Sequence, residues 1–283
     1  MVLSIGDIYM KFIKFAILFL VTSVFFGALA TSAIATEGES WWDEPMRFHV
    51  NVYGWLPEAP ATIKVDGEEV AGLPESLDTI LDSLDAAAMF ELEAHKGPVG
   101  VFVNTVYYEG EDDTSFTGPL GQRRKLEVSE DKVFIVTYGL GYSLGTWQLA
   151  KDAAYPRVTV TPYVGGFYFH DDLTMKVKPG ALGHGLNFKK NVEVHSPNVG
   201  LQTNWEFTDR FFVSLAGHYG GWDVDDVHRT RQFIGTGGYR FKMWDVSSKV
   251  FAGYRYLHLD LRKSDVEVHV DAKGPFFGVG WEF

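Results

Sequence analysis

Apolar residues alternate with small or polar residues along the last segment of the chain. Pro275, Phe277, Val279, Trp281 and Phe283 occupy every second position, with Phe276, Gly278, Gly280 and Glu282 between them. Segments 134–142, 199–207 and 211–220 repeat the scheme. Because successive side chains of a strand point to opposite sides, each segment predicts a strand with one apolar face and one small or polar face.

The composition of the two faces favours a barrel over a soluble sandwich. In a sandwich the bulky side faces a core and the polar side faces water. Here the polar side is rich in glycine, and the apolar side carries Trp, Tyr and Phe toward the strand ends. This is typical of a barrel with lipid outside and a polar lumen. Closure follows because an open sheet edge in hydrocarbon leaves backbone groups unpaired.

We therefore expect an all-β fold, a closed antiparallel up-and-down transmembrane β-barrel of about ten strands, with eight or twelve still open. The expected strands are 46–57, 86–96, 99–110, 126–143, 157–176, 189–207, 210–223, 229–242, 249–263 and 268–283. An even number places both ends in the periplasm. Short turns at 95–98, 208–210 and 243–248 then face the periplasm. The longer segments 58–85, 111–125 and 177–188 face outside, and 144–156 is long for a periplasmic turn.

One short helix is expected in the first outer loop, over residues 75–85. Leu77, Ile80, Leu81 and Leu84 form an apolar stripe, with Asp78, Asp82 and Asp85 opposite. Such a helix can cover the barrel rim or fold into the lumen as a gate.

The N-terminal segment predicts export. Lys11 and Lys14 precede an apolar run that ends in small residues at Ala33-Ile34-Ala35, the pattern of a secretory signal peptide. We expect residues 1–35 to be the signal and 36–283 the barrel domain, with cleavage after Ala30 and an uncleaved anchor as alternatives. The 283 residues contain no Cys and carry a formal charge of −12. This composition excludes disulfides and thiolate metal sites and does not suggest a nucleic-acid partner.

Polar residues on the glycine-rich faces are candidates for the lumen or its constriction. They are Glu91, Glu93, Asn104, Gln202, Asn204, Glu206, Arg240 and Arg255. Arg255 sets the orientation of its own strand, because a guanidinium facing lipid at mid-bilayer costs roughly 2–4 kcal/mol. Opposed acids and arginines can either fill a narrow barrel with ion pairs or filter small solutes by charge.

Candidate catalytic and metal sites are weaker. His195 and Ser196 are adjacent and so point to opposite faces, whereas Ser214 and His218 share a face about 13 Å apart. The pairs His258/Asp260 and His170/Asp172, and the acids Asp223, Asp225 and Asp226, could approach an ion but are common by chance. We expect no enzyme activity, no cofactor and no metal.

Several segments carry a family resemblance. They are Gly54-Trp55-Leu56-Pro57, 76–85, Glu93-Ala94-His95-Lys96-Gly97, Gly253-Tyr254-Arg255-Tyr256-Leu257 and Gly278-Val279-Gly280-Trp281-Glu282-Phe283. In these the chain resembles the uncharacterised porin-like outer-membrane β-barrel proteins of proteobacteria. The last strand also resembles the signal that barrel-assembly machinery captures. That resemblance implies an assembly role for Phe277, Val279, Trp281 and Phe283, with outer-membrane lipid as the other partner.

The expected function is a narrow porin-like channel for small solutes, or a structural membrane protein, in the bacterial outer membrane. An outer-membrane lipid-modifying enzyme and a surface adhesion protein acting through the outer loops are the alternatives.

Overall fold

The computed structural model describes residues 44–65, 68–73, 84–117, 123–151, 153–177, 186–263 and 266–283. The expected signal peptide lies outside these ranges and stays a prediction. Among the described residues there is no helix long and apolar enough to cross a membrane.

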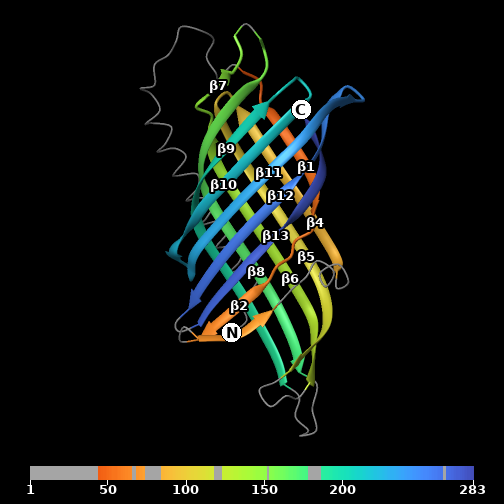
Figure 1. Ribbon diagram of the computed structural model, residues 1–283, viewed down its shortest axis with the longest axis vertical. Coiled ribbons are helices and arrows are strands. Elements are labelled where there is room, and N and C mark those ends of the chain that lie inside the picture. Colours follow the sequence, from red (N-terminus) through yellow and green to blue (C-terminus); the bar gives the residue numbers. More distant parts are fainter. Residues whose placement is uncertain are drawn as a thin grey trace. The chain divides into compact units, whose positions relative to one another are not determined.

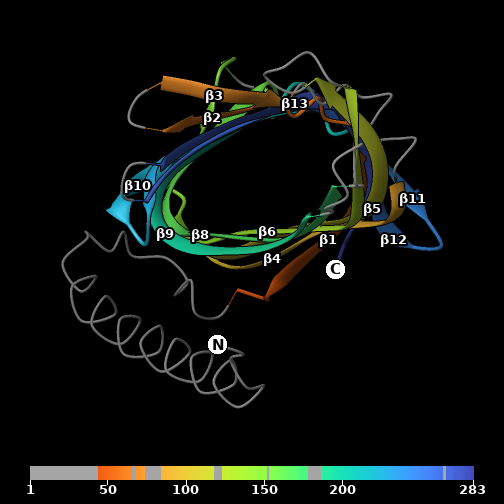
Figure 2. The ribbon, with the colours of Figure 1, turned by 90° about the horizontal axis from the view of Figure 1, so that it is seen from below.

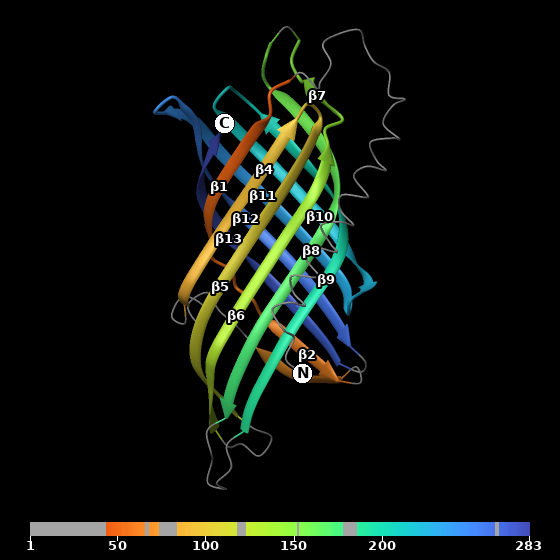
Figure 3. The same ribbon diagram turned by 180° about the vertical axis from the view of Figure 1, so that it is seen from behind.

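Ten antiparallel strands form a closed ring, as the alternation predicted (Figures 1 and 3). They are β1 (Arg47–Trp55), β4 (Leu84–Lys96), β5 (Val99–Thr117), β6 (Arg123–Tyr142), β8 (Arg157–Val177), β9 (Leu186–Glu206), β10 (Phe211–Val224), β11 (Val227–Met243), β12 (Val246–Lys263) and β13 (Val266–Glu282). Pairing of β1 with β13 closes the ring, which is flattened in cross-section (Figure 2).

Three short strands outside the ring were not predicted. β2 (Ala61–Val65) and β3 (Glu68–Leu73) form a hairpin, and β2 pairs with the first residues of β13. β7 (Gly145–Gln148) pairs with the start of β8, which accounts for the length of segment 144–156. The expected helix over 75–85 lies outside the described residues except for Leu84 and Asp85. These two residues begin β4, so the helix was wrong there.

The first strand begins and the last strand finishes at the same end of the ring, where Phe48 and Phe283 exchange backbone hydrogen bonds of 3.0 and 2.9 Å. By the rule for single-chain barrels this is the periplasmic end. The turn between β11 and β12 lies at the same end and contains Trp244 and Asp245, both with positive φ. At the opposite, outer end β5, β6, β8 and β9 continue into segments expected to be loops, so the outer loops are shorter than predicted.

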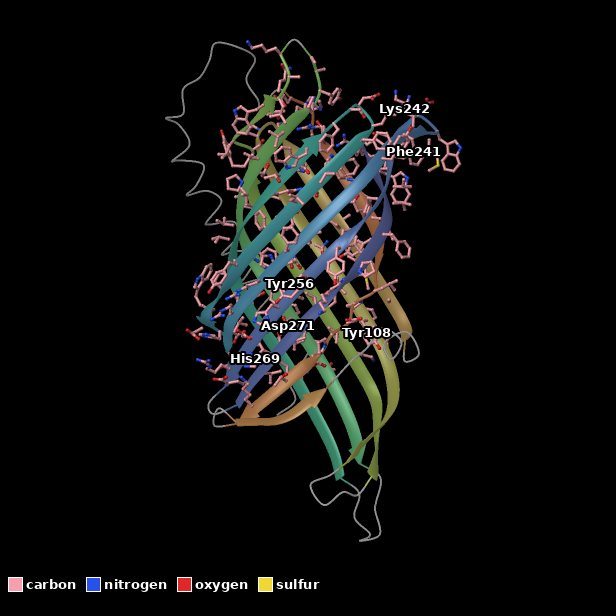
Figure 4. All side chains as sticks on the ribbon, in the orientation of Figure 1. Tyr108, Phe241, Lys242, Tyr256, His269 and Asp271 are labelled. Carbon is pink, nitrogen blue, oxygen red and sulfur yellow. The ribbon has the colours of Figure 1, made fainter. Side chains whose placement is uncertain are left out.

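The exterior of the ring changes character along the strands. Toward the periplasmic end it is an exposed apolar band that includes Phe48, Val52, Val103, Tyr142, Val164, Leu201, Phe207, Phe211, Leu215, Val250, Phe277, Val279 and Phe283. Toward the outer end it carries charged and hydrogen-bonding groups. Examples are the Lys132–Glu109 pair at 3.2 Å and, in Figure 4, the neighbouring side chains of Tyr256, His269 and Asp271.

The interior changes in the opposite sense. Near the periplasm it is polar, as predicted. Toward the outer end it holds one cluster of buried apolar side chains, here called the outer core: Trp55, Met89, Val106, Ile135, Phe167, Val194, Val227, Leu257, Leu259, Ala272 and Phe276. The expectation of apolar outside and polar inside is therefore right for the periplasmic half, whereas the interior of the outer half combines this apolar cluster with buried polar side chains such as Ser196, Asn198 and Thr230. Where the strands leave the bilayer, water surrounds the wall and the apolar face turns inward.

Candidate functional site: the periplasmic vestibule

A cavity of about 950 Å³ occupies the periplasmic part of the lumen and is here called the vestibule. All eight predicted lumen residues line it: Glu91, Glu93, Asn104, Gln202, Asn204, Glu206, Arg240 and Arg255. They meet because the strand registers bring inward positions level with one another. Glu91 of β4 pairs with Asn104 of β5, for example.

Arg255 forms the inner end of the vestibule and is only 2% exposed. Its Nε and Nη2 donate to Gln232 Oε1 at 2.9 and 2.6 Å. Its Nη1 donates to Tyr53 Oη and to Asn104 Oδ1, both at 3.2 Å. The guanidinium carbon lies 4.7 Å from the centre of the Trp55 ring. A buried cation needs such partners, because an unpaired one is costly in a low-dielectric interior.

Asn104 connects Arg255 with the nearest carboxylate. Its Oδ1 accepts from Arg255, and its Nδ2 donates to Glu91 Oε2 at 3.0 Å. Glu91 Oε1 also accepts from Asn51 Nδ2 at 2.8 Å. The positive and negative charges are thus held one side chain apart. We call Arg255, Gln232, Tyr53, Asn104 and Glu91 the central network.

A second set of charges lies on β8, β9, β11, β12 and β13, and Glu282 of β13 is the cross-strand partner of His49 on β1. Glu206 pairs with Arg157, and its Oε1 lies 2.7 Å from Arg240 Nη1. Glu282 Oε1 lies 3.7 Å from Arg240 Nε and 3.9 Å from Lys249 Nζ. This set therefore holds three cations and two carboxylates.

A third set lies on β1 and β4, where Glu93 was predicted for the lumen and its two histidine partners were not. Glu93 Oε2 lies 3.3 Å from His49 Nδ1 and 2.9 Å from His95 Nε2. Glu93 and His95 alternate on one strand, which was readable in the sequence. His49 joins them only because β1 pairs with β4 in this register, and one sequence does not reveal register.

Outside the ring, the loosely predicted pair His258/Asp260 belongs to a larger group on β12 and β13. Asp260 Oδ1 accepts from His258 at 3.0 Å and also contacts His269, while Asp271 Oδ1 accepts from Tyr256 at 2.7 Å. Burial raises the pKa of Asp260, but hydrogen bonds from His269 and His258 outweigh it and hold that pKa below its usual value. Burial also raises the pKa of Asp271, but hydrogen bonds from Tyr256 and His258 outweigh it and hold that pKa below its usual value. This group is a network of hydrogen bonds on the exterior of β12 and β13.

The Ser and His residues weighed for catalysis lie apart. Ser196 points into the outer part of the barrel and is fully buried, whereas His195 lies on the exterior with its Nε2 2.6 Å from the hydroxyl of Tyr138. Ser214 lines the vestibule. His218 is buried beside Phe167, with ring centres 6.3 Å apart. The four residues predicted for assembly lie on β13 and at its end, and their assembly role stays a prediction.

The closed ring, its exposed apolar band and its polar vestibule define a β-barrel protein of the bacterial outer membrane. No family model and no curated protein matches the sequence.

Solved structures similar in fold include three from other bacteria. The translocator domain of autotransporter NalP from Neisseria meningitidis has a TM-score of 0.40 and 11% identity, covering 98% of this chain and 99% of that chain. The outer membrane protein OprG from Pseudomonas aeruginosa has a TM-score of 0.37 and 12% identity, covering 87% and 99%. Ail, the attachment invasion locus protein of Yersinia pestis, has a TM-score of 0.33 and 12% identity, covering 85% and 99%. At these identities the similarity concerns the fold alone.

Proposed function

We propose that the protein is a closed outer-membrane barrel that holds small polar ligands in a vestibule facing the periplasm. The role is one of binding, without catalysis. One observation carries the proposal: Arg255 lines the vestibule and yet is 2% exposed, because the central network and the outer core surround it. A side chain so buried leaves no wide aqueous path past it.

The vestibule suits a small polar molecule in size and chemistry. Its volume of about 950 Å³ is within the ordinary range of small-molecule sites, roughly 300–1,000 Å³. Carboxylates and imidazoles of β1 and β4 line it together with the cations Arg157, Arg240 and Lys249 of other strands. A ligand carrying both charges would find a partner for each.

Two serines that both point inward provide a matched test, since the chain has no Cys. Ser214→Cys lies in the vestibule and Ser196→Cys in the outer part of the barrel, where Ser196 has 0% exposure. With folded protein in detergent, a small sulfonated thiol reagent should modify the first cysteine within minutes. The second should react only after unfolding. Equal rates in folded protein would show an open path and overturn the proposal.

A narrow gated channel is the second candidate. It is favoured by a smaller pocket of about 90 Å³ whose lining, including Thr137 and Gln232, extends the polar surface. Planar-bilayer recording separates the two functions. Discrete conductance that changes in Arg255→Ala supports the channel, whereas silence from protein that shows heat-modifiable migration supports the closed barrel.

A further inference from the structure

Three metal-ligating side chains meet on the β1–β4 wall of the vestibule. Donor atoms of His49, Glu93 and His95 all lie within 4.8 Å of one another. His49 and Glu93 are directly opposed across the two strands, and His95 follows Glu93 on the same face of β4. Two adjacent strands therefore hold the three groups, and β-sheet hydrogen bonding fixes their spacing. All three line the vestibule, so a solute in the vestibule reaches them.

The position of His95 is set by a glycine on the next strand. Gly100 of β5 is the cross-strand partner of His95. A Cβ at Gly100 would lie 2.5 Å from His95 Nδ1, well inside contact distance. The imidazole therefore lies over Gly100 in space that a side chain there would fill. In this pose Nε2 is the nitrogen directed at Glu93 Oε2, at 2.9 Å.

We infer that His49, Glu93 and His95 bind one divalent transition-metal ion of the zinc type. Two imidazole nitrogens and one carboxylate oxygen suit Zn²⁺, Co²⁺, Ni²⁺ or Fe²⁺ better than the oxygen-seeking Mg²⁺ and Ca²⁺. Three protein ligands also leave at least one coordination position open to the vestibule. The ion would lie between the two imidazoles, whose ring centres are 5.3 Å apart, and would take the place of their contacts with Glu93.

The surrounding charges are compatible with a bound cation. The positive charge of Lys249 reaches Glu93, and its Nζ also lies 3.9 Å from Glu282 Oε1 on β13, the strand that pairs with β1, so this ammonium has a second carboxylate partner. Glu91 neighbours Glu93 on the same inward face of β4, where Asn51 and Asn104 donate to its carboxyl group. The site requires only the folded barrel, so it stands whether the barrel is closed or conducts.

The test uses protein purified from outer membranes without a histidine tag, stripped with a chelator and titrated with Co²⁺ or Zn²⁺ alone. We expect one Co²⁺ per chain, with visible absorption bands that Zn²⁺ abolishes. His49→Ala and His95→Ala should each weaken binding by more than about 100-fold, beyond the loss expected for an outer partner. Gly100→Ala removes no ligand but displaces the His95 ring, and should weaken binding by roughly 10–100-fold.

His228→Ala is the matched control. His228 Nδ1 lies 2.6 Å from Asp223 at the outer end of the barrel, and among the described residues no third metal-ligating group completes this pair. Binding in this variant should equal that of the unmodified protein. Heat-modifiable migration on unboiled gels verifies folding of every variant. The inference is overturned if the unmodified protein binds no ion, or if the His49→Ala/His95→Ala double variant binds one equally well.

Discussion

At the scale of single residues, Arg255 shows how one side chain decides the orientation of a strand. A guanidinium cannot face the acyl chains cheaply, so β12 turns this position inward. Burial then demands partners, which Gln232, Tyr53 and Asn104 supply with four hydrogen bonds, while the face of Trp55 covers the cation. The sequence was sufficient to predict the inward direction. The partners come from β1, β5 and β11, and only the closed ring brings them together.

Arg255→Ala should lower the free energy of unfolding by about 3 kcal/mol. The estimate follows because hydrogen bonds to a charged group are worth roughly 1.5–3 kcal/mol each and because Gln232 loses its charged donor. The free energy of unfolding of Arg255→Lys should fall between those of the unmodified protein and Arg255→Ala, since an ammonium cannot reproduce the planar fork of the guanidinium. Denaturant unfolding in lipid vesicles, followed by Trp fluorescence, measures both.

Arg210→Ala provides the comparison for this measurement. Arg210 is at a periplasmic turn, with its side chain 63% exposed, and its removal should change stability by less than about 0.5 kcal/mol. Equal effects of the two alanine variants would contradict a structural role for the central network.

At the scale of elements, the ten strand positions were predictable and the polarity of their outer halves was not. Period-two alternation locates a strand but does not say which face is inside. The sequence of β8 nevertheless shows the change, because its apolar residues move from one set of alternate positions to the other. Val160 and the exposed Val164 share one phase, whereas Phe167 and Phe169 occupy the other phase and join the outer core or pack against it. The short strands β2, β3 and β7 were not predicted, because they contain too few residues to show a period.

The reversal predicts a depth dependence along the exterior of β13. Val279 lies in the apolar band and is 42% exposed, whereas His269 lies among the outer charged groups. Val279→Arg should cost about 2–4 kcal/mol in vesicles, because it places a charge in hydrocarbon. His269→Arg should cost less than about 1 kcal/mol. Similar costs at the two positions would mean that the bilayer covers the outer half as well.

At the scale of the whole molecule, the ring is closed by the pairing of its first and last strands. β1 pairs with β13 on one side and with β4 on the other. The β1–β4 ladder ends at Val52 and Phe90, after which the Trp55 N–H donates to Met89 Sδ at 3.1 Å. Beyond that point β2 continues along β13 in place of β1. Closure therefore depends on a short ladder between residues 221 to 233 positions apart in the sequence, which no local pattern encodes.

An engineered disulfide tests that closure directly. Val52 of β1 and Val279 of β13 are directly opposed, and such pairs have Cα atoms about 4.5–5.5 Å apart, within disulfide range. Since the chain has no Cys, Val52→Cys/Val279→Cys contains two thiols. Mild oxidation of folded protein should protect nearly all of them from maleimide until reductant is added. The control Val52→Cys/Leu215→Cys places its two thiols on β1 and β10, which are not neighbours in the ring. Both thiols should stay fully reactive. An open sheet packed as a sandwich would leave both pairs reactive, because its first and last strands need not meet.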